Sequence, residues 1–223
     1  MDTKGKGPLL LLLASTLVLC QNVASRPTCA PGDKCHLVLQ ELYQRAKTLS
    51  WSVHFYTLDM LLELMDVHSQ RPGYFAPAKQ RCRMADILTP YWQNKARLMQ
   101  EKDLVHMAVY LLNSWNDTLP GLALDTHILL KFYHPHSSKD RNITLTYQQL
   151  KEVTVQIASQ LDIEVPDKVN FALQSYTESL MSSDERTLLF SVYSTLRCFF
   201  IDVKKIHFLF SLLKCRADNK VNC

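Results

Sequence analysis

The longest periodic stretch of the chain, residues 184–215, constrains the fold more than any other feature. It contains no Pro or Gly, and Ser182 and Glu185 have the spacing of a helix capping box at its start. A helix of this length cannot bury an apolar stripe alone, so the fold needs at least two partner helices of similar length. The apolar residues recur at alternating steps of three and four, as on one stripe of an α-helix; they are Leu189, Val192, Leu196, Phe199, Val203, Ile206, Phe210 and Leu213.

A first partner helix is predicted from Leu39 to Val67, where apolar residues again recur at helical spacing. It follows a small loop, residues 29–35, and residues 71–73 end it with a Pro-Gly pair. The long connection that follows contains Thr89-Pro90, a good N-cap and first-turn pair, so we expect a short helix there.

A second partner helix is predicted to start near Asp103, a suitable N-cap residue. Pro120-Gly121 is expected to break or kink it, with a helical continuation over residues 122–133. Its predicted buried face consists of Leu104, Ala108, Leu111, Leu112, Trp115 and Leu119.

A third partner helix is predicted to start at a capping box formed by Thr146 and Gln149 and to end at Pro166. A second long link, residues 167–183, leads to the C-terminal helix. The sequence therefore predicts an all-α protein. Four long helices with two long crossover connections are typical of up-up-down-down four-helix bundles, the long-chain helical cytokine architecture.

The N-terminus is predicted to be a secretory signal peptide, residues 1–25. Lys4 and Lys6 precede an apolar run, and small residues lead to a cleavage point after Ser25. The apolar run is too short for a transmembrane anchor. We therefore expect a secreted, extracellular protein without membrane insertion, with one domain over residues 26–223.

Removal of the signal peptide leaves an even set of cysteines: Cys29, Cys35, Cys82, Cys198, Cys215 and Cys223. In a secreted chain such a set predicts disulfides, and several connectivities are compatible with it. Proximity in sequence suggests Cys29–Cys35 and Cys215–Cys223. The remaining pair, Cys82–Cys198, would tie the first long connection to the C-terminal helix.

Charge and motifs argue against several classes of function. The formal net charge of +4 is too small to indicate nucleic-acid binding. The eight histidines include no i,i+4 pair with an intervening carboxylate, so no metal site is predicted. Gly-x-Ser-x-Gly, a phosphate-binding glycine loop and His-Glu-x-x-His are absent from the sequence. We expect neither an enzyme nor a cofactor.

Several residues at fixed spacing resemble a known family. From Cys198 to Cys215 the chain is similar to the C-terminal signature of the growth hormone and prolactin family, and Cys82 to Pro90 is similar to its other signature, although Met84 replaces a hydroxyl residue. Ser114-Trp115-Asn116 and the additional N-terminal loop resemble prolactins. The C-terminal pattern consists of Cys198, Phe199, Asp202, Val203, Leu209, Leu212 and Cys215.

The resemblance implies a helical hormone that binds the ectodomain of a class I cytokine receptor. In this family a first receptor site uses helix one, the first long connection and helix four, and a second site uses parts of helices one and three. The first-site positions carried over to this chain are Trp51, His54, Lys204, Lys205 and Leu209. His54 and Lys205 match family residues, whereas Trp51 and Lys204 replace histidines and Leu209 replaces a tyrosine.

The second site departs from the family at Val153, which stands where prolactin has a glycine in the receptor groove. One hypothesis is that this side chain fills the groove and weakens binding of a second receptor. The alternative is that Val153 lies on the apolar stripe of its helix and faces the core. Together with Pro120-Gly121, the departures suggest a divergent, placental-type member whose receptor is the prolactin receptor or an unidentified relative.

Glycosylation sequons and clusters of basic residues are two further features of the predicted extracellular surface. Asn116 and Asn142 begin glycosylation sequons. Basic residues gather at Lys79, Arg81 and Arg83 and again at Lys214, Arg216 and Lys220. These clusters leave an alternative open: an extracellular protein of the same family that binds heparan sulfate or matrix without classical receptor signalling.

Overall fold

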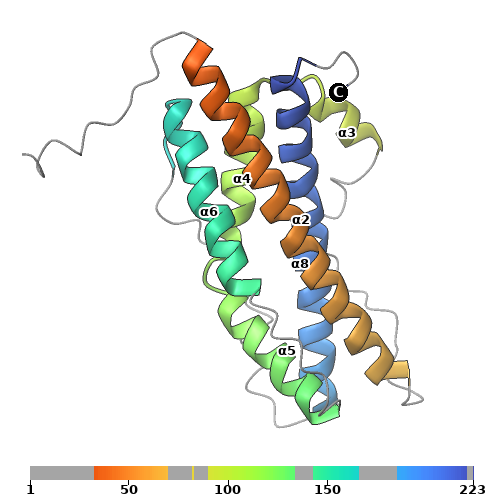
Figure 1. The fold of residues 1–223 in the computed structure, drawn as a ribbon. Helices are drawn as coiled ribbons and strands as arrows, with labels where there is room; N and C mark the ends of the chain where they lie inside the picture. Colours follow the sequence, from red (N-terminus) through yellow and green to blue (C-terminus); the bar gives the residue numbers. More distant parts are fainter. Residues whose placement is uncertain (1–32, 70–81, 83–89, 134–142, 166–184, 220–222) are drawn as a thin grey trace, which may run out of the picture. The chain divides into compact units, whose positions relative to one another are not determined.

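The computed structural model describes residues 33–69, 82, 90–133, 143–165, 185–219 and 223. These residues contain helices and no strand, so the all-α prediction is confirmed. The helices are α2 (Asp33–Ser69), α3 (Pro90–Ala96), α4 (Glu101–Ser114), α5 (Leu119–Tyr133), α6 (Ile143–Gln160) and α8 (Glu185–Ala217) (Figure 1).

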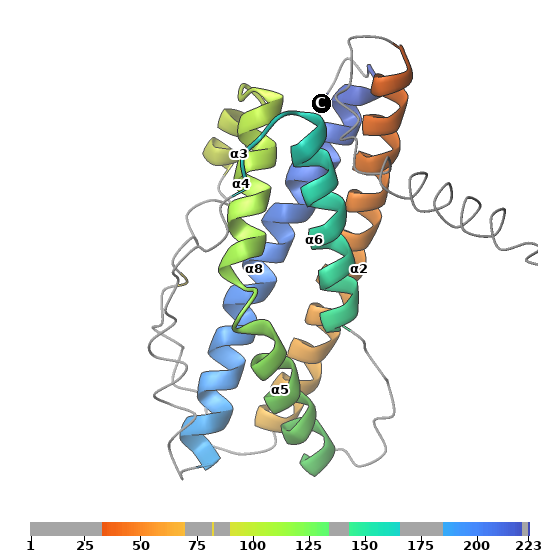
Figure 2. The same ribbon diagram turned by 90° about the vertical axis from the view of Figure 1, so that its left-hand side faces the viewer.

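The long helices form the predicted up-up-down-down bundle. α2 and the α4–α5 pair run in one direction, and α6 and α8 run in the other (Figures 1 and 2). α2 packs on α8 and α6, and α4 packs on the same two helices. The order around the bundle is therefore α2, α6, α4, α8, so the α4/α6 seam lies on the opposite side from the α2/α8 seam.

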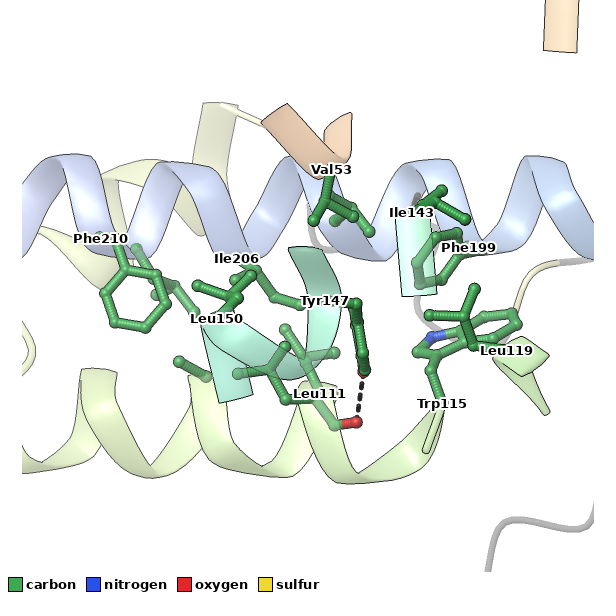
Figure 3. Packing of buried hydrophobic residues seen from close by; sticks show 14 of the residues in the cluster. Val53, Leu111, Trp115, Leu119, Ile143, Tyr147, Leu150, Phe199, Ile206 and Phe210 are labelled. Atoms are coloured by element: carbon green, nitrogen blue, oxygen red, sulfur yellow. Dashed lines mark hydrogen bonds between the residues drawn. The ribbon is translucent and has the colours of Figure 1, made fainter. Parts of the chain in front are cut away.

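The core forms along α8, as its periodicity predicted. Every residue of the predicted α8 stripe is at most 1% exposed, and so is nearly all of the predicted buried face of α4. Phe199 packs against Trp115, directly after α4, and Tyr147 of α6, with ring centroids 5.1 and 5.8 Å apart (Figure 3). The Tyr147 hydroxyl donates a hydrogen bond to the Leu112 carbonyl, so this buried polar group is satisfied.

The break in the second long helix lies before the predicted position. α4 ends at Ser114, residues 115–118 form a turn, and Pro120 is the second residue of α5. A proline is tolerated in the first turn of a helix, but its ring would meet the carbonyl of Asn116 if the helix were continuous. The interruption therefore falls in the turn that precedes the proline, a few residues before the predicted break at Pro120-Gly121.

Three predicted helix starts were wrong by a few residues. α2 begins at Asp33, before Cys35, so the small N-terminal loop and the helix overlap. α4 begins at Glu101, with Gln100 as N-cap, so Asp103 is its third residue. α6 begins at Ile143, three residues before the predicted cap Thr146. An acidic residue is favourable anywhere in a first turn, so Asp103 fits its observed position equally well.

The end of α6 also differs from the proline-based prediction, whereas the end of α2 is compatible with it. α2 ends at Ser69, just before the predicted stop at residues 71–73, but α6 ends at Gln160, well before Pro166. Asp162 follows α6 with a φ of 54°, and the amide of Ile163 donates to the Ala158 carbonyl at 2.9 Å. This left-handed turn satisfies the last carbonyls of α6 and stops the helix without proline.

Two of the three predicted disulfides are present in the structure. Cys82 pairs with Cys198 of α8, with Cα atoms 5.1 Å apart, and Cys215 pairs with Cys223, with Cα atoms 5.7 Å apart. The pairing of Cys29 with Cys35 and the cap residue Ser182 lie outside the described residues. None of the described helices has an apolar run long enough to cross a bilayer.

Candidate functional site

The outer face of α2 and α8 carries a cluster of rings, formed by Trp51 and His54 of α2 and Phe200 and His207 of α8. Trp51 lies between the two imidazoles, with ring centroids 5.6 Å from His54 and 5.3 Å from His207. The His54 ring stacks on Phe200 at 4.7 Å. The Trp51 side chain is 54% exposed. We call these four residues the ring cluster.

Helical spacing brings the ring cluster together. Residues three or four apart lie on one face of a helix, as do Trp51 and His54 on α2. On α8, Phe200 and His207 are separated by two turns, with the exposed Lys204 between them. Because α2 packs on α8 along much of its length, the two faces meet at a single surface.

His207 is oriented by two serine hydroxyls. Ser50 Oγ donates to the Lys47 carbonyl at 2.9 Å and lies 3.1 Å from His207 Nδ1, so Nδ1 is the donor in that contact. Nε2 of the neutral ring then accepts from Ser211 Oγ at 3.4 Å. Burial lowers the pKa of His207; a hydrogen bond with the Lys47 backbone opposes this shift, and the charge of Lys47 adds to it.

His54 is less well satisfied than His207. Within the described part of the chain, both of its ring nitrogens are shielded from solvent and have no hydrogen-bond partner. Burial lowers the pKa of His54, and the proximity of His207 and of the charged Lys204 lowers it further. Both imidazoles are therefore neutral at pH 7, and the ring cluster presents a mainly apolar surface.

The ring cluster continues into an exposed apolar stripe on α2, formed by Trp51, Phe55, Leu62 and Met65. These residues follow one another at steps of four, seven and three, so they share a face of the helix. We call them the α2 stripe. Of this set only Trp51 was predicted from the sequence as a site residue, although the second helical periodicity beside the core positions of α2 could have revealed the others.

α3 lies next to α8 and is fixed to it by Arg216. The guanidinium donates to the carbonyls of Met99 at 2.8 Å, Arg97 at 2.6 Å and Ala96 at 3.4 Å, which lie at the end of α3 and in the turn that follows it. Trp92 of α3 packs on Phe208 of α8, with ring centroids 5.7 Å apart. Sequence reasoning missed this role of Arg216, because no local motif links residues so far apart.

Two predicted first-site residues do not reach the surface. Lys205 and Leu209 are both 0% exposed. Lys205 Nζ forms an ion pair with Asp202 Oδ1 at 2.8 Å, and Asp202 Oδ2 accepts from Nε1 of Trp115, the C-cap residue of α4, at 2.9 Å. α8 is covered by α2, α4 and α5, so residues beside its main stripe are buried as well. The receptor-facing prediction was therefore wrong for Lys205 and Leu209.

Val153 also faces the interior. Its side chain is 1% exposed and shares a buried face of α6 with Leu150, Thr154 and Ile157. A side chain in that position cannot fill a groove on the outer surface. The structure therefore supports the core-facing alternative and contradicts the hypothesis that Val153 blocks a second receptor.

The described basic residues near the C-terminus make contacts within the protein. Lys214 pairs with Asp218, which also accepts from Gln40 Nε2 of α2 at 2.6 Å, and Arg216 binds the end of α3. Lys214 and Arg216 thus do not support a heparan sulfate surface. The other members of both clusters lie outside the described residues: Lys79, Arg81, Arg83 and Lys220.

The two sequons differ in what the structure describes. Asn142 lies outside the described residues. Asn116 lies in the turn between α4 and α5, and its Oδ1 accepts a hydrogen bond from Lys151 Nζ of α6 at 2.7 Å. This contact joins the α4–α5 turn to α6, whereas the ring cluster lies on α2 and α8.

Comparison with known proteins agrees with this architecture. The chain is 29% identical over 215 residues to the prolactin of Mesocricetus auratus. The aligned region covers 96% of this chain and 95% of that prolactin. It is 29% identical over 218 residues to the prolactin of Alexandromys montebelli, covering 98% and 96% of the two chains. Residues 12–223 match the profile of the somatotropin hormone family. The chain belongs to the somatotropin hormone family.

Proposed function

We propose that this protein is a secreted, prolactin-like hormone that binds the extracellular domain of a class I cytokine receptor through the ring cluster and the α2 stripe. The observation that carries the proposal is the exposure of Trp51 and its apolar neighbours on one face of α2. Contiguous exposed apolar side chains rimmed by polar residues mark protein interaction surfaces. Family membership and the similarity to two prolactins support a receptor as the partner.

The composition of the surface fits a binding interface rather than a reaction site. Tryptophan is enriched among the residues that contribute most to binding energy, especially where less critical contacts exclude water around it. Trp51 has such neighbours, since its ring lies beside those of His54 and His207 and the exposed Phe55 follows one turn later on α2. The ring cluster provides no activated nucleophile, since its only titratable groups are two neutral imidazoles. The hormone would act by bringing receptor chains together.

The chemistry of the face favours a receptor adapted to this chain. Relative to the family pattern, Trp51 replaces a histidine, so a polar donor is lost and apolar area is gained. A matching receptor would offer an apolar pocket for the indole and an acidic group near Lys204. The receptor would be the prolactin receptor or an unidentified relative with such a surface, as expected for a divergent, placental-type member of the family.

Binding to a panel of class I cytokine receptor ectodomains tests the proposal. The glycosylated chain, purified from a mammalian secretion medium, is passed over each immobilised ectodomain, and Kd is measured for every receptor that binds. Trp51→Ala should raise Kd about 30-fold, which corresponds to the loss of ~2 kcal/mol at a central contact. Circular dichroism confirms that the variant remains folded.

Leu124→Ala is the matched control. Leu124 is also a large exposed apolar residue, 58% exposed, but it lies on α5. Its replacement should change Kd less than twofold. Equal effects of the two substitutions, or no binding to any ectodomain of the panel, would contradict the proposed function.

A further inference from the structure

The sequon at Asn116 lies in the turn that separates α4 from α5 (Figure 2). Asp117 is exposed, and Asn116 and Thr118 are partly exposed. Asn116 Nδ2 donates to Asp117 Oδ1 at 3.0 Å, and both atoms belong to side chains at the surface. The turn therefore places the side-chain amide of Asn116 at a partly exposed position, where a bulky substituent on Nδ2 can extend into solvent.

The amide oxygen of Asn116 accepts a hydrogen bond from a lysine on a neighbouring helix. Lys151 Nζ of α6 donates to Asn116 Oδ1 at 2.7 Å, a short charge-assisted hydrogen bond. Attachment of a sugar replaces one hydrogen on Nδ2 and leaves Oδ1 unchanged as an acceptor. One Nδ2 hydrogen also remains for Asp117. Both contacts of the Asn116 side chain are thus compatible with the modified residue.

We propose that Asn116 carries an N-linked glycan and that Lys151 is the positioning residue that holds the glycosylated amide against α6. In the transfer step, Nδ2 of Asn116 forms a bond to C1 of the first N-acetylglucosamine of a lipid-pyrophosphate-linked oligosaccharide. The bond from C1 to the pyrophosphate oxygen breaks, the lipid pyrophosphate leaves, and the amide gives up one proton. The host's oligosaccharyltransferase supplies the donor and the base.

The position of the site determines what the glycan can cover. Asn116 and Lys151 lie at the α4/α6 seam, and this seam is opposite the α2/α8 seam that carries the ring cluster. A glycan rooted there shields the back of the bundle and leaves the α2 stripe accessible. The modification is consistent with receptor binding at the front, but it does not depend on it.

Peptide mapping tests the site directly. The full chain is secreted from mammalian cells and treated with peptide N-glycosidase in heavy-oxygen water, which converts a formerly glycosylated asparagine to labelled aspartate. We expect the label at residue 116 in the wild-type chain and in Thr118→Ser, which keeps the sequon, and its loss in Thr118→Ala. Thr144→Ala, which removes only the Asn142 sequon, should leave the label at residue 116. An unlabelled Asn116 in the secreted wild-type chain overturns the proposal.

Native deglycosylation tests the role of Lys151. Release of the glycan from folded protein requires access to the amide bond, so the loss of one net hydrogen bond in Lys151→Met should accelerate release at residue 116 about fivefold. Lys131→Met, a change at an exposed lysine of α5, should leave the rate unchanged. Equal release rates in wild type and Lys151→Met would overturn the positioning role. Neither measurement involves a receptor, so failure here is distinct from failure of the proposed function.

Discussion

Replacement of Val153 by glycine is expected to destabilise the bundle, whereas the sequence resemblance would have it open a receptor groove. The side chain is 1% exposed on the inner face of α6. Burial of a valine side chain contributes roughly 1.5–3 kcal/mol, and the cavity left behind adds to that loss. Glycine in a helix interior costs about 0.5 kcal/mol more than valine. The free energy of unfolding should therefore fall by about 3 kcal/mol.

α6 itself offers the matched control. Val155 is two residues further along the same helix, and its side chain is 42% exposed. Val155→Gly carries the same change in helix propensity but removes little buried surface, so it should cost only about 0.5 kcal/mol. The difference between the two variants isolates the burial of Val153.

Thermal and urea unfolding with intact disulfides measure the effect. In a domain of this size 1 kcal/mol shifts Tm by about 2–4 °C, so Val153→Gly should melt roughly 6–12 °C below wild type and Val155→Gly within about 2 °C. The urea m-value should stay constant, since the same surface is exposed on unfolding. Equal stability of the two variants, combined with tighter binding of a second receptor by Val153→Gly, would refute the core assignment.

Three further predictions concern polar contacts. Lys205→Met should lower the free energy of unfolding by about 3 kcal/mol, because it leaves the partly buried Asp202 carboxylate without its ion-pair partner. Lys204→Met at the exposed neighbouring position should change it by less than about 0.5 kcal/mol. Chemical denaturation distinguishes the two. Arg216→Met should speed amide hydrogen exchange across residues 90–99 several-fold by removing the donors at the end of α3, and unchanged exchange would show that this contact does not hold the helix. The pKa values of His54 and His207 are lowered in the folded state, so the stability associated with their neutral forms is present above pH ~6.5 and is lost as the pH falls through the folded pKa values. The Tm of the wild-type protein should therefore drop between pH 7.5 and 5. The drop should be smaller in His54→Phe, which has one titrating imidazole fewer.

The parts of the fold that were predicted correctly rest on long-range periodicity. The stripe of α8 repeats over many turns, so an error at one position does not change the conclusion that one face is buried. Helix ends depend on single capping contacts instead. Thr146 has the chemistry of an N-cap, but α6 begins at Ile143. Short polar residues also occur inside first turns, and a local motif cannot separate the two positions.

The candidate site was predicted in part for a related reason. Trp51 and His54 lie on the outer face of α2, and Lys204 is exposed on α8, as expected from the resemblance. Periodicity indicates where the centre of a buried stripe lies but not how wide it is. Lys205 and Leu209 lie beside that stripe, and the helices that cover α8 bury them. Only the packing of α4 and α5 on α8 determines this width.

The α2 helix connects the fold to the proposed function, because it carries two apolar stripes and the bundle buries only one. Ala46, Val53 and Leu64 lie on the inner stripe and are fully buried. The outer stripe around Trp51 and Phe55 contributes little to folding, since it stays in contact with water. Its transfer free energy, about 25 cal/mol for each Å² removed from water, is therefore still available to a partner that covers it. Polar substitutions on the outer stripe should weaken binding while leaving the unfolding transition in place, and the same substitutions on the inner stripe should abolish the fold.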